Sequence, residues 1–301
     1  MSFRGVYPIL YAFFRADGSL DRDAMRLQVE SAVAAGAHGL AILGLATEVS
    51  KLTERERLDV LEWAAEDLAG RLPLAVTVYG TSVAQQVEFV RAAERVGASW
   101  VILQPPPVRG LPEHEYVGFF ARVAGETGLP VAVQNAAQYV GVGLGRAGIE
   151  SLMAAAPNFT LLKGEASAVE IRQLVEVTEG RLGVFNGRGG MELPDILRAG
   201  CVGMIPAPDT FDAQVRIFDL MASGSPSEVA EAEASYARIL PTIVFVMQSI
   251  EAMLCYGKRI AAWRLGLSTV HDRAPALAPT EFGLACARRF AEALGPLPGA
   301  R

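Results

Sequence analysis

Short apolar runs alternate with amphipathic segments along most of the chain. Eight of the runs are almost continuously apolar, and they lie within residues 6–13, 34–44, 70–80, 95–105, 127–135, 159–162, 180–187 and 197–207. Continuous apolar runs of this length are typical of parallel strands that are buried on both faces of the sheet. The pattern therefore predicts eight parallel β-strands.

The segments between these runs have the helical period. In residues 21–35, apolar side chains recur on one face and charged side chains on the other. A further helix is predicted to begin at Thr53, because Glu56 three residues later completes a capping box. Three of the helical patterns stop at a glycine, as a left-handed C-cap favours: Gly36, Gly97 and Gly200.

Eight strand–helix units within the first 224 residues predict an α/β fold, a (β/α)8 TIM barrel. An open doubly wound sheet is the alternative, but no GxGxxG turn follows the first strand. Beyond residues 222–230 the pattern is helical only, over about 227–254 with Pro241 inside, 256–266 and 280–295. We expect a catalytic barrel over 1–224 and a C-terminal helical extension over 225–301 that serves packing or oligomer assembly.

Composition narrows the function classes. The net charge of −6 is spread along the chain without a basic block, so we expect no nucleic-acid partner. No apolar run reaches the roughly 18 residues that span a bilayer. The first ten residues also lack the regions of a signal peptide, so we expect no membrane partner and a cytoplasmic protein. Three cysteines and three histidines are scattered, which favours reduced thiols and no metal site.

Lysine is rare, and one lysine follows a buried strand. Only Lys51, Lys163 and Lys258 are lysines among the 27 basic residues. Lys163 lies in the run LLKGEAS at 161–167, where burial would disfavour the charged amine and supply the neutral form that attacks a carbonyl. The alternative is a lysine that reaches solvent or pairs with Glu165. Lys51 and Lys258 have polar neighbours on helix-like segments, so we interpret both as solvated side chains.

Other polar residues follow the predicted strands at the end where TIM barrels carry their active sites. Glu48 comes just after the second strand, and the remaining strand ends carry Gln104, Gln134, Asn135, Lys163, Glu165 and Asn186. Because side chains two residues apart leave the same face of a strand, Lys163 and Glu165 are expected to point the same way.

Nearly the whole chain resembles the dihydrodipicolinate synthase and N-acetylneuraminate lyase family of class I aldolases. The resemblance rests on AFFRADGSLD at 12–21, GLATE at 44–48 in place of the family's GTTGE, LLKGEAS at 161–167, NGRGG at 186–190 and the helical C-terminus. It implies that Lys163 forms an imine with a small 2-oxo acid, without a cofactor, in a homo-oligomer that is a tetramer or a dimer.

The resemblance also implies a set of substrate-binding positions. Backbone amides of GLATE would bind the substrate carboxylate, with a hydroxyl from Thr47. Glu48 is expected to brace the loop by bonding its amides, and a catalytic Glu48 is the alternative. The set from this loop is Gly44, Leu45, Ala46, Thr47 and Glu48, and later in the chain it includes Asn186, Gly187 and Ile205. In the NGRGG loop, a tight turn that gives the substrate room beside the backbone fits the family better than a phosphate site, although Arg188 leaves a phosphorylated substrate open.

The departures from the family pattern are equally informative. The strand 5 tyrosine of the family's Y-N-x-P pattern is replaced by Gln134, the hydroxyl pair of the strand 2 loop by Leu45 and Ala46, and the tyrosine loop after strand 4 by PPPVRG. Gln138 stands where the synthases place an arginine. These changes argue against authentic dihydrodipicolinate synthesis. They favour a neutral, hydroxylated substrate tail, which amides can bind: Gln134, Asn135, Gln138 and Asn186.

Glu165 is the candidate base. A carboxylate beside the imine can take the C3 proton and form the enamine, from which loss of the C4 hydroxyl is dehydration. The K-x-E pair resembles family dehydratases that act on 2-keto-3-deoxy sugar acids, so we expect such a dehydratase. A pyruvate-dependent aldolase is the second candidate, and a barrel that binds small molecules without catalysis is the third. Tyr139 is either a substitute acid or a packing residue.

Overall fold

The computed structural model describes residues 3–300, and its centre is a sheet of eight parallel strands. The strands are β1 (Gly5–Val6), β2 (Leu40–Ile42), β3 (Leu74–Val78), β4 (Trp100–Leu103), β5 (Val131–Asn135), β6 (Phe159–Gly164), β7 (Gly183–Asn186) and β8 (Gly203–Met204). Their order in the sheet is β1-β8-β7-β6-β5-β4-β3-β2. The eight predicted strands are confirmed, and each overlaps the apolar run that predicted it, with β1 beginning one residue earlier and β6 ending two residues later than its run.

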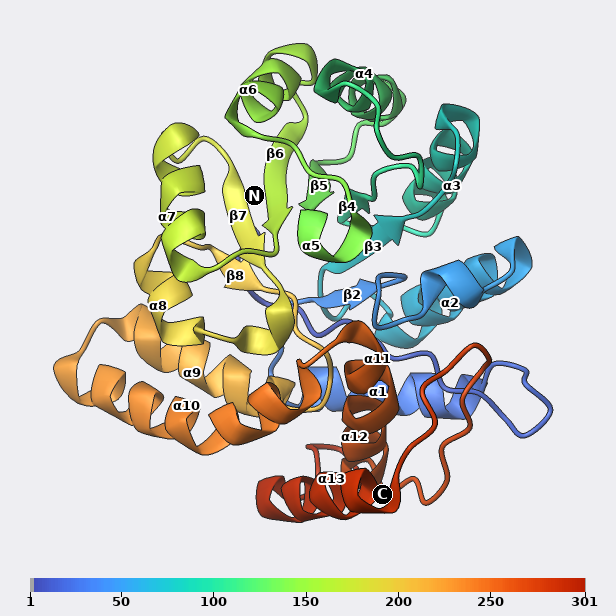
Figure 1. Ribbon diagram of the computed structural model, residues 1–301, viewed down its shortest axis with the longest axis vertical. Coiled ribbons are helices and arrows are strands. Elements are labelled where there is room, and N and C mark those ends of the chain that lie inside the picture. Colours follow the sequence, from blue (N-terminus) through green and yellow to red (C-terminus); the bar gives the residue numbers. More distant parts are fainter. Residues whose placement is uncertain (1–2, 301) are drawn as a thin grey trace.

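The sheet closes on itself just beyond β1. Ile9 forms a parallel bridge with Ala41, and the amide of Ala41 donates to the carbonyl of Pro8 at 3.0 Å. Figure 1 shows the strands in the middle of the molecule with helices around them. The predicted TIM barrel is therefore confirmed.

Helices follow the strands and cover the outside of the barrel. They are α1 (Arg22–Ala34), α2 (Glu54–Leu68), α3 (Val83–Arg95), α4 (Glu113–Ala124), α5 (Ala137–Val140), α6 (Arg146–Ala155), α7 (Ala168–Val177), α8 (Leu193–Arg198) and α9 (Phe211–Ser223), with short 3-10 turns η1 (Val49–Lys51) and η2 (Arg188–Gly190). The predicted capping box at Thr53 and Glu56 is present, and the glycines predicted as C-caps have φ of +71°, +81° and +102°.

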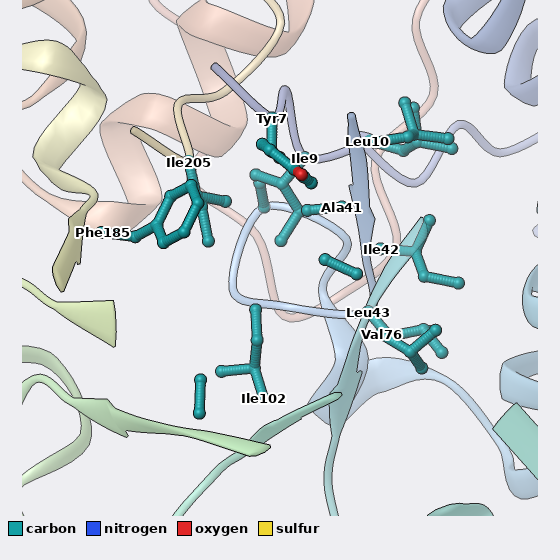
Figure 2. Close-up of a cluster of buried hydrophobic side chains, with 14 of the residues drawn as sticks. Tyr7, Ile9, Leu10, Ala41, Ile42, Leu43, Val76, Ile102, Phe185 and Ile205 are labelled. Carbon is teal, nitrogen blue, oxygen red and sulfur yellow. The ribbon is translucent and has the colours of Figure 1, made fainter. Parts of the chain in front are cut away.

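Large apolar side chains fill the inside of the barrel. The rings of Tyr7, Trp100 and Phe185 come from three different strand regions and pack with centroid separations of 5.2 to 5.7 Å. Figure 2 shows two of these rings, Tyr7 and Phe185, near Ile9, Ile102 and Ile205. Because this interior is packed, a substrate site is restricted to the C-terminal ends of the strands.

The C-terminal extension differs from its prediction at one corner. A continuous helix was predicted over about 227–254, but α10 (Pro226–Val246) ends at Val246 and α11 (Ile250–Ala252) follows. The helical axes of residues 226–246 and 250–264 differ in direction by 107°. The hydroxyl of Ser249 caps the second segment by accepting a hydrogen bond from the amide of Ala252. The remaining elements are the π-helical turn η3 (Met253–Gly257), α12 (Lys258–Arg264) and α13 (Glu281–Leu294).

Within residues 3–300 no single helix is long and apolar enough to cross a membrane. Residues 226–246 and 250–264 pass that test only when they are taken together, and they are sharply bent against each other.

An ion pair ties the extension to the barrel, and it makes a testable prediction. Arg273 donates to both carboxylate oxygens of Glu56 at 2.6 and 2.9 Å, and these bonds lower the pKa of Glu56 to about 2. A carboxyl group whose folded pKa lies below its unfolded value stabilises the fold above the unfolded pKa and loses that contribution as the pH falls. We expect Glu56→Gln to lower the free energy of unfolding by about 1 to 2 kcal/mol at pH 7.

The difference between the native protein and Glu56→Gln should shrink as the pH falls from 4.5 toward about 2. Urea unfolding across this range measures it. Glu54→Gln is the matched control, because Glu54 is exposed in the same first turn of α2. A difference that stays constant down to pH 3 would contradict the assignment.

Candidate active site

Lys163 lies at the mouth of the barrel, one residue before the end of β6. Its side chain is 4% exposed, and its Nζ lies 3.1 Å from Oε1 of Glu165. The two side chains leave the same face of the chain, as the two-residue period predicts. Lys163 is therefore buried, as the first interpretation of this residue expects. It is also paired with Glu165, as the second expects.

A row of amides connects Glu165 with the neighbouring strands. Gln134 on β5 donates to Oε1 of Glu165 at 3.1 Å. Gln104, directly after β4, donates to the amide oxygen of Gln134 at 2.8 Å. These bonds orient the carboxylate toward Lys163 and continue the polar site from β6 across to β4.

Gly187 and Gln138 are the neighbours that position Glu165. A Cβ added to Gly187 would lie 2.9 Å from Cδ of Glu165 and 3.0 Å from its Oε2, so the absence of a side chain at Gly187 leaves space for the carboxylate. The amide of Gln138 donates to the backbone carbonyl of Glu165 at 2.6 Å. Both positions, predicted to contact substrate, thus contact the candidate base.

The loop after β2 is held in an unusual backbone conformation. Leu43 and Glu48 bracket it with φ of +63° and +54°, a region that non-glycine residues seldom adopt. Thr47 is buried, its hydroxyl donating to the carbonyl of Leu10 at 2.6 Å and accepting from the amide of Leu43 at 3.0 Å. The hydroxyl of Thr47 therefore fixes the loop, and its predicted contact with substrate remains untested.

Glu48 is buried between two lysines. Lys258 in the extension donates to its Oε1, and Lys51 donates to its Oε2 at 2.6 Å. Glu48 braces the loop as predicted, but its partners are ammonium groups instead of loop amides. The prediction that Lys258 is solvated is wrong: it is 1% exposed, and burial lowers its pKa while Glu48 opposes that effect. Lys51 is partly buried, so its prediction as a solvated residue is wrong as well.

Three further predicted positions serve the structure around the site. The amide of Asn135 exchanges two hydrogen bonds with the backbone of Leu144, at 2.7 and 3.0 Å. Asn186 donates to the carbonyl of Ala166 at 2.8 Å and accepts from the amide of Gly187. Ile205 is buried next to Phe185 (Figure 2). Their contacts with substrate stay predictions.

Tyr139 and Arg188 lie beside the candidate base. Tyr139 on α5 is partly buried, and its pKa is raised first by burial and then by the carboxylate of Glu165, while Arg188 opposes the rise. Arg188 has φ of +53° and donates to Glu192 at 2.9 Å.

Two cavities reach this group of residues. The first, of about 610 Å³, lies between α5, α6 and α7 and is bordered by Glu165, Asn135 and Gln138. The second, of about 480 Å³, lies over the ends of β2 to β4 and beneath the extension, with Gln104 and Leu45 in its wall. Lys163 borders neither, but its partner Glu165 borders the first, and the amide row joins Glu165 to the second.

Sequence reasoning missed the residues that the extension adds. Lys258, Ile250 and Leu254 come from a segment interpreted as a packing or oligomer element, yet Lys258 holds the β2 loop and the other two border the second cavity. The scarcity of lysine was the one signal that singled out Lys258. Residues 3–300 contain no cluster of three His, Cys, Asp or Glu side chains able to hold a metal ion.

Two curated relatives are similar over most of the chain. YagE of Escherichia coli K12, named as a candidate 2-dehydro-3-deoxy-D-gluconate aldolase, is 26% identical over 241 residues, which are 79% of this chain and 80% of YagE. The 4-hydroxy-tetrahydrodipicolinate synthase of Acidobacterium capsulatum is 31% identical over 207 residues, which are 66% of this chain and 67% of that one.

One of these two relatives, YagE, also has a solved structure with a similar fold. The crystal structure of YagE in complex with pyruvate matches with a TM-score of 0.86 at 22% identity, over 98% of this chain and 99% of YagE. The model of the Dihydrodipicolinate synthetase family matches residues 2–281. This chain therefore belongs to the dihydrodipicolinate synthetase family.

Proposed function

We propose that the protein is a Schiff-base lyase that removes water from a 2-keto-3-deoxy sugar acid. The observation that carries the proposal is the buried pair of Lys163 and Glu165 at the barrel mouth, 3.1 Å apart. An amine buried beside a carboxylate can transfer its proton to that carboxylate and attack a ketone as the neutral form. The pair thus supplies both the nucleophile and the base.

The proposed reaction has four steps. The neutral amine of Lys163 attacks C2 of the 2-oxo acid, and the protonated Glu165 returns its proton to the former carbonyl oxygen, which leaves as water while the protonated imine forms and Glu165 becomes a carboxylate again. Glu165 then removes a proton from C3, and the electron pair of that C–H bond forms the enamine. The protonated Glu165 returns the proton to the departing C4 hydroxyl, which leaves as water, and hydrolysis of the conjugated imine frees Lys163.

The binding roles follow from positions around this pair. Backbone N–H groups of residues 44–48 would hold the carboxylate, and the bonds made by Thr47 and Glu48 support this role by fixing the loop. Gln134 would contact the hydroxyl that leaves, because it already bonds to Glu165. Gln138 and Tyr139 lie on the same side of the site, and Tyr139 is the second candidate acid.

An aldolase that releases pyruvate is the second candidate, favoured by the name of YagE. Cleavage of the C3–C4 bond requires a base for the C4 hydroxyl, and the strand 5 position that would carry it holds Gln134. The same position, together with Gln138, supports the proposal that dihydrodipicolinate synthesis is not the reaction, because neither amide can pair with a second carboxylate.

Borohydride trapping tests the proposal. Incubation with pyruvate and borohydride, followed by mass spectrometry, should give one adduct that maps to Lys163. Lys163→Ala should abolish the adduct, whereas Lys51→Ala, the matched control, should retain it. If no 2-oxo acid in a panel gives an adduct, the barrel binds small molecules without this chemistry. Release of water against release of pyruvate from 2-keto-3-deoxy acids then separates dehydratase from aldolase.

A second prediction concerns Gly187. In Gly187→Ala the new methyl group would displace the carboxylate of Glu165, so turnover should fall by about 10- to 100-fold while the Lys163 adduct still forms. The control is Gly118→Ala, since nothing lies within 4 Å of a Cβ added to Gly118. Unchanged turnover in Gly187→Ala would show that the position of Glu165 does not matter.

We also propose a homo-oligomer, a tetramer or a dimer. The support is the resemblance to the dihydrodipicolinate synthase family, since the exposed side chains of Phe282 and Val169 are single residues and do not by themselves mark an interface. Light scattering coupled to gel filtration tests this, with a monomer at working concentrations as the opposing result.

A further inference from the structure

The row of amides that runs from Gln104 to Glu165 has a direction. An ionised carboxylate accepts hydrogen bonds and donates none, so Glu165 bonds only to the nitrogen end of Gln134, at 3.1 Å. The oxygen end of Gln134 then faces Gln104, whose side-chain nitrogen donates to it at 2.8 Å. If the amide of Gln134 were turned round, two acceptors would face each other at Glu165. The donor of Gln104 therefore determines which end of Gln134 reaches the carboxylate.

Gln104 is itself held in place. Its backbone amide donates to the carbonyl of Val78 at 3.0 Å, and its backbone carbonyl accepts from the side chain of Gln86 at 2.8 Å. Gln86 is buried on α3 and also donates to the carbonyl of Gly80, at 3.2 Å. Because Gln104 and Gln134 are 4% and 1% exposed, little water is available to replace a lost bond between their amides.

The two carboxylate oxygens of Glu165 have different surroundings. Both the ammonium of Lys163 and the amide of Gln134 lie 3.1 Å from Oε1. Within residues 3–300, Oε2 has no hydrogen-bond partner, and it lies in the space that the absent side chain of Gly187 leaves. The lone pairs of Oε1 are therefore used by two donors, and Oε2 is the oxygen that is free to accept a proton.

We propose that Gln104 is a positioning residue for proton transfer: through Gln134 it anchors Oε1 of Glu165 and leaves Oε2 to take the C3 proton of the imine. The inference rests on the proposed function and adds a residue and an atom to it. Gln104 bonds to Gln134 and makes no bond to Glu165 itself. Its effect should therefore reach the proton transfer only through Gln134, without changing the affinity for the 2-oxo acid.

Exchange of the methyl hydrogens of pyruvate measures this proton transfer without the natural substrate. In the imine of pyruvate, Glu165 takes a proton from C3, and in D2O the enamine takes back a deuteron, so the methyl signal in the proton NMR spectrum decreases. Gln104→Met keeps the length of the side chain and removes its donor. We expect the exchange rate at saturating pyruvate to fall about tenfold, the size of one hydrogen bond to a charged group. The pyruvate concentration for half-saturation and the borohydride adduct should stay unchanged.

A double-mutant cycle separates positioning from packing. If Gln104 acts through Gln134, Gln104→Met should have little further effect in a protein that already carries Gln134→Met. A packing role would instead give two losses that add, together with a weaker affinity for pyruvate. Gln104→Leu repeats the test if Gln104→Met does not fold. Gln85→Met is the matched control, since Gln85 is an exposed amide on α3, and its exchange rate should equal that of the native protein.

The failure of this inference differs from the failure of the proposed function. Native exchange rates in Gln104→Met, or additive losses in the cycle, would overturn the role of Gln104 and leave Lys163 and Glu165 in their proposed roles. If the native protein gives no borohydride adduct, or an adduct without exchange, the proposed function is overturned and the role of Gln104 falls with it.

Discussion

Glu165→Gln should form the imine and fail to turn over. The amide can still bond to Lys163 and Gln134, so the site keeps its shape, but it cannot accept a proton from C3. Because a positioned general base contributes about 100- to 10,000-fold, we expect a fall of that size in the rate of water release. Borohydride trapping should still give the Lys163 adduct, which separates imine formation from proton transfer.

The control for this variant is Glu176→Gln, an exposed residue on α7. Its turnover and unfolding temperature should equal those of the native protein. If Glu165→Gln retains turnover within about threefold, the base lies elsewhere. Tyr139 is then the next residue to replace, with phenylalanine, since its hydroxyl is influenced by Glu165 and Arg188.

Lys258→Met should be the most destabilising single change outside the barrel. It would leave Glu48 buried with Lys51 as its remaining cationic partner, and breaking a buried ion pair on one side typically costs 3 to 5 kcal/mol. We expect a loss of about 3 kcal/mol in urea unfolding. Glu48 itself has the left-handed backbone conformation at the end of the β2 loop, and its bond to Lys258 helps to hold it there. Without that bond the loop should loosen, and pyruvate should bind more weakly.

Adding Glu48→Gln to Lys258→Met should restore part of this stability by removing the unpaired charge, and the double-mutant cycle measures the coupling. Lys51→Met is the matched control. Its side chain is 18% exposed, so water replaces part of the lost interaction and we expect a smaller loss. A Lys258→Met protein as stable as the native one would show that Glu48 needs no partner from the extension.

The barrel was predictable because its signals are local. Each strand lies in an almost continuous apolar run, and the glycines before three of them, at positions 36, 97 and 200, adopt the left-handed conformation that ends a helix. The corner after Val246 was missed, although the sequence carries a local signal there. Gln248 and Ser249 interrupt the apolar pattern where the chain turns, and serine is a preferred N-cap residue, the role that Ser249 has in α11.

The candidate active site was likewise predictable where its contacts join residues that are close in the sequence, and not where they join distant ones. The pairing of Lys163 and Glu165 follows from a spacing of two along one strand. The pairing of Glu48 with Lys258 joins residues 210 positions apart, and no period in the sequence connects them. A charged residue with polar neighbours reads as a surface residue, so Lys258 was misplaced. The role of Gly187 could not be predicted from the sequence either, because the space that it leaves is filled by Glu165, which follows a different strand.

The roof of the second cavity comes from residues 250–277, whereas the reacting amine comes from β6. This part of the cavity wall can thus be altered without changing β6. Exchange of the 250–277 stretch between homologues, with Lys258 retained, would reshape the cavity and leave Lys163 and Glu165 as they are.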